Sequence, residues 1–172
     1  MRYINAPLKI DFDIENSSKE FKHEYDSLSS ADDDSIGEWL RLAKARGNTE
    51  DSDQVLLTLV VELHRKIDEM NAFMRGEKQD FLTLTCSADI DAINYEYFKL
   101  TNEIFEENIE YYGRIEMPFF PKRQVPIYFK AISKNEAKIV LVHERDEKDW
   151  NAYVVARERV MIREMKANKD GN

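Results

Sequence analysis

The residues able to ligate a metal or act as nucleophiles are few and lie apart along the chain. Histidines occur at positions 23, 64 and 143, and the one cysteine is Cys86. His143-Glu144-Arg145-Asp146 contains metal-capable types, but no second histidine stands at ligand spacing. Asp146 is better explained as the N-cap of a following helix. No serine lies in a nucleophile-elbow context, so the residues predict no metal site, no catalytic group and no cofactor.

Charged side chains offer two further kinds of site. The chain has 34 acidic and 25 basic residues and a formal net charge of -9, so an enzyme with a carboxylate pair in a cleft stays open as an alternative. The nearest approach to an anion site is Arg75, Lys78 and the turn Pro121-Lys122-Arg123. The five glycines are too scattered for a Walker or dinucleotide motif. The excess of acid argues against nucleic-acid binding.

Length and apolar patterning limit the class of protein. The 172 residues suit one domain, or one domain plus an appendage. The apolar runs are too short to cross a bilayer, and the start of the sequence leads into no apolar signal segment. A single cysteine is typical of a reducing compartment. We therefore expect a cytoplasmic protein with no membrane insertion.

The first third of the chain is acidic and begins with a strand pattern. Residues 1–53 hold 13 acids and 7 bases. Leu8 to Glu15 alternates apolar and polar side chains at every step, which predicts a strand. Residues 16–34 form a polar leader with Phe21, Tyr25 and Leu28 as sparse anchors, and its end, 29–34, predicts a loop.

Two helices follow the leader. Capping-box spacing at Ser35 and a stop at Gly47 predict a short helix over 36–46. A long helix is expected over 50–75, with acids at its N-terminus and Gly76 at its end. Its apolar residues are spaced 4, 3, 4, 3 and 4, which is a heptad pattern: Leu56, Val60, Leu63, Ile67, Met70 and Met74.

This heptad face favours self-association. Further apolar residues at Leu57, Leu59, Val61 and Phe73 widen the face beyond a dimer seam, which favours three or four helices. The alternative is ordinary internal packing, because fewer than three heptads is short and such a stripe is often a core face. We expect a homo-oligomer, a tetramer or a dimer, assembled through residues 54–75.

The chain changes to β patterning after Gly76. Six segments predict strands: 81–85, 90–93, 97–100, 111–117, 125–132 and 137–143. Short strands at even spacing indicate an antiparallel sheet or small barrel. A last helix is expected over 147–168, with an apolar face that begins at Trp150 and basic residues at its end.

The segment from Phe81 to Lys166 resembles the PilZ domain family. The resemblance rests on Asp91-Ala-Ile-Asn-Tyr-Glu-Tyr-Phe-Lys-Leu100, on the strands Tyr111 to Pro118 and Pro126 to Ile132, and on the terminal helix from Arg145 to Arg163. It implies an α+β fold: a six-stranded antiparallel β-barrel with a C-terminal helix, preceded here by a short helix and a long oligomerising helix. Typical members bind cyclic diguanylate.

The sequence departs from the family at the ligand positions. Ala92, Asn94 and Tyr97 stand where the family has Asp or Asn, Ser and Gly, and Tyr97 puts a ring where the backbone must approach the nucleotide. The family's paired arginines are reduced to Arg75 and Gln79. The resemblance therefore implies an atypical PilZ protein that does not bind cyclic diguanylate in the usual way.

These patterns together predict three segments: residues 1–34 as N-terminal strand and polar leader, 35–76 as the helical oligomerisation segment, and 77–172 as the barrel. The expected function is a non-enzymatic bacterial interaction protein in motility signalling, with itself and an unidentified protein as partners. The alternative is a working cyclic diguanylate receptor with a degenerate site made of Arg75, Lys78, Asn94 and Arg123.

Overall fold

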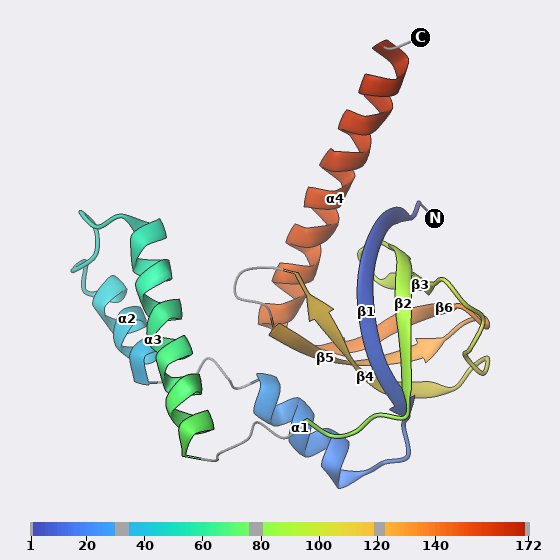
Figure 1. Ribbon diagram of the computed structural model, residues 1–172, viewed down its shortest axis with the longest axis horizontal. Coiled ribbons are helices and arrows are strands. Elements are labelled where there is room, and N and C mark those ends of the chain that lie inside the picture. Colours follow the sequence, from blue (N-terminus) through green and yellow to red (C-terminus); the bar gives the residue numbers. More distant parts are fainter. Residues whose placement is uncertain (1, 30–34, 76–80, 119–122, 171–172) are drawn as a thin grey trace. The chain divides into compact units, whose positions relative to one another are not determined.

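Six antiparallel strands close into a β-barrel, to which the C-terminal helix α4 is joined (Figure 1). The computed structural model describes residues 2–29, 35–75, 81–118 and 123–170. The strands follow the order β1-β2-β3-β6-β5-β4 around the barrel. Their bounds are Ile4–Ile14 (β1), Cys86–Ile93 (β2), Tyr97–Leu100 (β3), Glu110–Met117 (β4), Arg123–Ala131 (β5) and Glu136–Val142 (β6). The expected α+β class, antiparallel six-stranded barrel and C-terminal helix are confirmed.

The first barrel strand is β1, which pairs with β2 on one side and with β4 on the other. Every second side chain from Ile4 to Phe12 is buried, as strand alternation requires. The sequence-based barrel boundary at 77–172 is therefore wrong. The expected strand at 81–85 is also wrong, because the N–H and C=O of Leu82 bond to side chains instead of to a neighbouring strand.

The chain divides into two compact units. One comprises Met1–Ser29 and Leu82–Asn172, and the other comprises Ser30–Phe81. We call them the barrel unit and the helical unit. The helical unit is inserted between β1 and β2, so the expectation that the helices precede the whole barrel is wrong. The physical reason is that the N-terminal strand completes the barrel wall.

Aromatic rings fill the barrel interior. The ring centroids of Phe12, Phe105, Tyr111 and Phe129 lie 5.2 to 6.0 Å apart, mostly edge to face or tilted. Trp150, Tyr153 and Val154 of α4 (Glu144–Asp170) belong to the same buried cluster. The first half of α4 is therefore part of the barrel core.

The start of α4 differs from the sequence prediction. The backbone N–H of Arg145 donates to His143 Nδ1 at 3.3 Å, and the N–H of Glu147 donates to the His143 carbonyl at 2.9 Å. The helix begins at Glu144 rather than near residue 147. Asp146 is thus not the N-cap but a residue of the first turn, and it is 1% exposed.

Helix α1 (Lys19–Ser29) lies where a polar leader was expected. Ser18 begins it, since its hydroxyl accepts the N–H of Glu20 at 3.1 Å. Two of the three anchors contact the outside of the barrel: Phe21 stacks on Tyr112 with 5.0 Å between centroids, and Tyr25 lies 5.4 Å from Tyr128. Residues 30–34 of the expected loop lie outside the described residues.

The helical unit contains α2 (Ser35–Ala45) and α3 (Gln54–Met74), close to the expected bounds. Gly47 ends α2 with φ 75°, and the N–H of Asn48 donates to the Ala43 carbonyl at 3.0 Å. Asp53 begins α3, since its carboxylate accepts the N–H groups of Val55 and Leu56 at 2.9 and 3.2 Å. Among the described helices, none has the length and apolarity that a bilayer span requires.

Candidate functional site

Six apolar side chains lie exposed along one face of α3. Their exposed fractions range from 49% for Ile67 to 79% for Met74. We call this set the α3 row: Leu56, Val60, Leu63, Ile67, Met70 and Met74. Leu59 widens the exposed face, Leu57 and Val61 are half-buried, and the side chain of Phe73 lies outside the described part. The structure thus places all six predicted interface residues on one accessible stripe.

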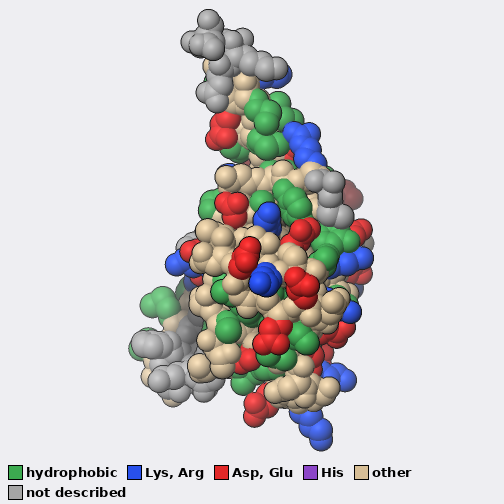
Figure 2. Space-filling view, turned by 90° about the vertical axis from the view of Figure 1, so that its right-hand side faces the viewer, with side chains coloured by type: hydrophobic (Ala, Val, Ile, Leu, Met, Phe, Trp, Pro, Cys, Tyr) green, Lys and Arg blue, Asp and Glu red, His purple; other side chains and the backbone are tan. Residues whose placement is uncertain are grey.

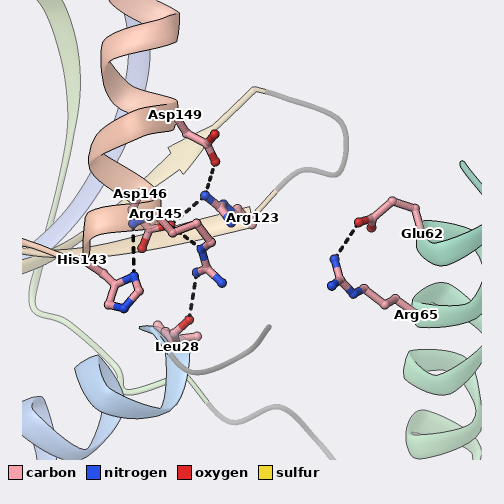
Figure 3. A network of polar contacts seen from close by, with 8 residues as sticks. All are labelled: Leu28, Glu62, Arg65, Arg123, His143, Arg145, Asp146 and Asp149. Atoms are coloured by element: carbon pink, nitrogen blue, oxygen red, sulfur yellow. Dashed lines mark hydrogen bonds and ion pairs between the residues drawn. The ribbon is translucent and has the colours of Figure 1, made fainter. Parts of the chain in front are cut away.

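The opposite side of α3 makes the internal contacts of the helical unit. Glu62 is 5% exposed and accepts a hydrogen bond from Arg65 Nη1 at 2.7 Å (Figure 3). A cavity of about 800 Å³ is lined by α2 and by this side of α3, including Arg41, Val61 and Arg65. The internal packing of α3 in the described chain therefore uses other residues than the α3 row.

Asn94, a candidate nucleotide ligand, forms the turn between β2 and β3. Its Oδ1 accepts the N–H groups of Glu96 and Tyr97 at 2.9 and 2.8 Å. Its carbonyl accepts the indole N–H of Trp150 at 3.0 Å. Asn94 is 9% exposed, and its Nδ2 makes no hydrogen bond with the described residues. Its side-chain oxygen is therefore committed to the turn.

Arg123, the second candidate in the barrel unit, is held by carboxylates of α4. Its guanidinium lies 2.7 Å from Asp146 Oδ1 and also contacts Asp149 (Figure 3). Arg145 donates to the same Asp146 oxygen at 3.1 Å and to the Leu28 carbonyl at 3.3 Å. This network ties β5, the start of α4 and the end of α1 together, and it neutralises the charge of Arg123.

The two remaining nucleotide candidates lie outside the described barrel unit. Arg75 belongs to the helical unit, and Lys78 lies outside the described residues. Asn94 and Arg123 both lie in the barrel unit, and each is engaged in a separate set of intramolecular contacts.

The described histidines and carboxylates are the side-chain types that a metal site would require. His64 Nδ1 lies 3.1 Å from Asp68 Oδ2 on α3, and His143 begins α4. Within the described ranges no group of three metal-capable side chains converges. A hollow of about 330 Å³ against β1, β2 and β4 includes the carboxylates of Asp89, Asp91 and Glu116. Its described lining also has the ammonium of Lys9 and the hydroxyl of Thr101, but no histidine, cysteine or serine.

Sequence reasoning missed a buried polar network, which we call the Glu24 clasp: Glu24, Leu82, Tyr112 and Arg114. Glu24 Oε1 and Oε2 accept hydrogen bonds from Arg114 Nη1 at 2.9 and 3.0 Å, and Tyr112 Oη donates to Oε2 at 2.7 Å. The N–H of Leu82 donates to Glu24 Oε1 at 2.8 Å, and Arg114 Nη1 donates to the Leu82 carbonyl at 2.9 Å. The sequence did contain a signal for this helix: Phe21 and Tyr25 are spaced as on one face of a helix, and Glu24 lies next to that face.

Figure 2 shows acidic and basic side chains interspersed on the side of the molecule that it draws, without a broad area of one sign.

Comparisons of the chain with protein-family models, with curated proteins and with solved structures give no match.

Proposed function

We propose that this protein is a non-enzymatic interaction protein that self-associates through the α3 row and carries an atypical PilZ-like barrel. The observation that carries the proposal is the α3 row, which consists of six apolar side chains at heptad spacing. Each of them is about half exposed or more. Contiguous apolar surface of this kind marks interaction sites in soluble proteins. The repeat of 4 and 3 suits packing against a second copy of the same helix.

The size of the row is sufficient for association. Full burial of one such side chain stabilises by about 1.5–3 kcal/mol, so covering the half that is exposed yields roughly 1 kcal/mol each. Six residues on each of two chains then contribute roughly 12 kcal/mol. Association costs about 4–15 kcal/mol in lost freedom, so the row lies in the range where a homo-oligomer becomes stable.

The barrel supports the second half of the proposal. A closed six-stranded antiparallel barrel with a C-terminal helix is the architecture that the PilZ resemblance implies, although its first strand, β1, lies before the helical unit in the chain. Asn94 and Arg123 are engaged within the barrel unit, which supports a barrel that does not use them for cyclic diguanylate. The barrel surface would then serve a protein partner, in a bacterial regulator of motility or surface behaviour in the cytoplasm.

The test of self-association is the mass of two matched variants by light scattering. Leu63→Asp places a charge in the α3 row and should weaken assembly by about 100-fold or more, because a buried unpaired charge costs several kcal/mol. Val55→Asp is the control, since Val55 is 69% exposed on the same helix but outside the row. The proposal fails if the wild-type protein scatters as one 20.3 kDa chain, or if both variants keep the wild-type mass.

Calorimetry with cyclic diguanylate tests the remaining part. We expect no binding tighter than about 10 µM, because the paired guanidiniums and the close backbone approach are absent. Tighter binding would favour the alternative, a receptor with a degenerate site that uses Arg75, Lys78, Asn94 and Arg123. Arg123→Gln would then reduce the affinity.

A further inference from the structure

The Glu24 clasp joins two points of the chain that are far apart in sequence. Glu24 lies in α1, which ends at Ser29, the last residue before the helical unit. Leu82 is the first residue of the barrel unit after it. Both backbone polar groups of Leu82 are bound within the clasp, the N–H by Glu24 and the C=O by Arg114. The clasp therefore joins the two segments of the barrel unit between which the helical unit is inserted.

Burial makes the clasp costly to open. Glu24 and Arg114 are 7% and 6% exposed, and Tyr112 is fully buried. An ion pair in such a site depends on both partners, because removal of Glu24 leaves the buried Arg114 with the more distant carboxylate of Asp11, 4.0 Å away. Phe21 and Tyr25 pack α1 on Tyr112 and Tyr128 directly beside the carboxylate. Opening the clasp thus requires α1 to leave the barrel surface.

The clasp lies on the outside of the barrel wall. Along β4, Tyr111 belongs to the aromatic core, whereas Tyr112 and Arg114 point to the face that α1 covers. The ladder hydrogen bonds of β4 to β1 and β5 do not involve these side chains. Loss of the clasp therefore leaves the strand pairing in place.

From this geometry we propose that the Glu24 clasp is a conformational lock. It keeps the two segments of the barrel unit that flank the helical unit, α1 and the chain from Leu82 onward, joined to each other and to the barrel wall. Glu24 acts as the positioning residue, since it contacts all three other members of the clasp. This inference does not depend on the proposed function of the α3 row.

Hydrogen exchange measured by NMR on the full chain tests the lock. In Glu24→Ala we expect the amide of Leu82 and the amides of α1 to exchange about tenfold faster or more, because the acceptor of the Leu82 N–H is gone. The free energy of opening of these amides should lie below that of the β4 and β5 amides, because α1 and Leu82 can open while the strands stay paired. Glu20→Ala is the control, because Glu20 is an exposed residue of the same helix.

Two outcomes would overturn the inference. One is unchanged exchange at Leu82 in Glu24→Ala. The other is an opening free energy at Leu82 and in α1 that equals that of β4 and β5, which would show that the carboxylate only supports the whole barrel. Should Glu24→Ala fail to fold, Glu24→Gln serves, because its amide oxygen still accepts the Leu82 N–H but its charge is lost. For that variant the lock requires a larger acceleration of exchange, relative to wild type, in α1 than at Leu82. The reverse order refutes it.

Discussion

The role of Asn94 is open to a direct test by substitution. The Asn94→Ala change removes the acceptor of two backbone N–H groups, those of Glu96 and Tyr97, while the backbone bond from the Asn94 N–H to the Tyr97 carbonyl at 2.8 Å can remain. Each lost hydrogen bond contributes about 1 kcal/mol net, so the turn should lose roughly 2–3 kcal/mol. For a chain of this size, that loss lowers Tm by roughly 4–12 °C.

A matched variant separates the turn from other roles of Asn94. In Asn94→Ser a neutral acceptor oxygen is kept, and the lost Nδ2 makes no hydrogen bond with the described residues. We therefore expect Asn94→Ser to lie within about 1 kcal/mol of wild type. The free energy of unfolding is obtained from urea titration followed by near-ultraviolet circular dichroism, which reports on the buried Trp150.

The result that would refute this reasoning is an equal loss of stability in both variants. Equal losses would mean that the amide nitrogen, not the oxygen, makes the important interaction. A loss in Asn94→Ala below about 0.5 kcal/mol would refute it as well, because the two N–H groups would then not depend on the side chain.

Two further predictions concern the barrel wall. Gly113→Ala should destabilise the barrel by about 1–3 kcal/mol in urea titration, because the new Cβ would lie 2.9 Å from the Asp11 carbonyl oxygen and 3.1 Å from Phe129; wild-type stability would show that the wall can shift. Burial and the bond to Glu24 raise the pKa of Tyr112 above its ordinary 10.0, and burial raises the pKa of Tyr128 to about 12. The folded phenols then hold protons that the unfolded chain releases near pH 10, so these two groups should lower stability as the pH rises from 10 to 12; a urea midpoint that stays level in that range, or a slope that Tyr128→Phe leaves unchanged, would contradict this.

The barrel was predictable where side chains alternate strictly. The pattern of β1 identifies a strand, and the heptads of α3 identify a long helix, because a strand and a helix each expose one face at a fixed period. What the pattern does not contain is connectivity. The local sequence pattern does not show that β1 lies between β2 and β4. That arrangement pairs Lys9 with Asp89 and with Glu116, which are remote from it in sequence.

The polar contacts were the least predictable part. Glu24 looks like one more acid in a polar leader, and its burial depends on Tyr112 and Arg114, which are remote in sequence. Asp146 has the residue type of an N-cap, but the ion pair with Arg123 determines its place. The sequence shows which residues are charged, whereas the partner of a buried charge is determined by the tertiary structure.

The insertion between β1 and β2 has a consequence for synthesis on the ribosome. Strand β1 is made first, but its partners begin only at Cys86 and Glu110. At about 5–20 residues per second, the interval from Ile14 to Cys86 lasts roughly 4–14 s. Helices α2 and α3 belong to the helical unit and can form within that time, since a helix forms on the order of microseconds, whereas the contacts of α1 with β4 and β5 come later. The nascent chain thus carries finished helices beside an apolar strand without partners, and the barrel closes only when β4 to β6 have emerged.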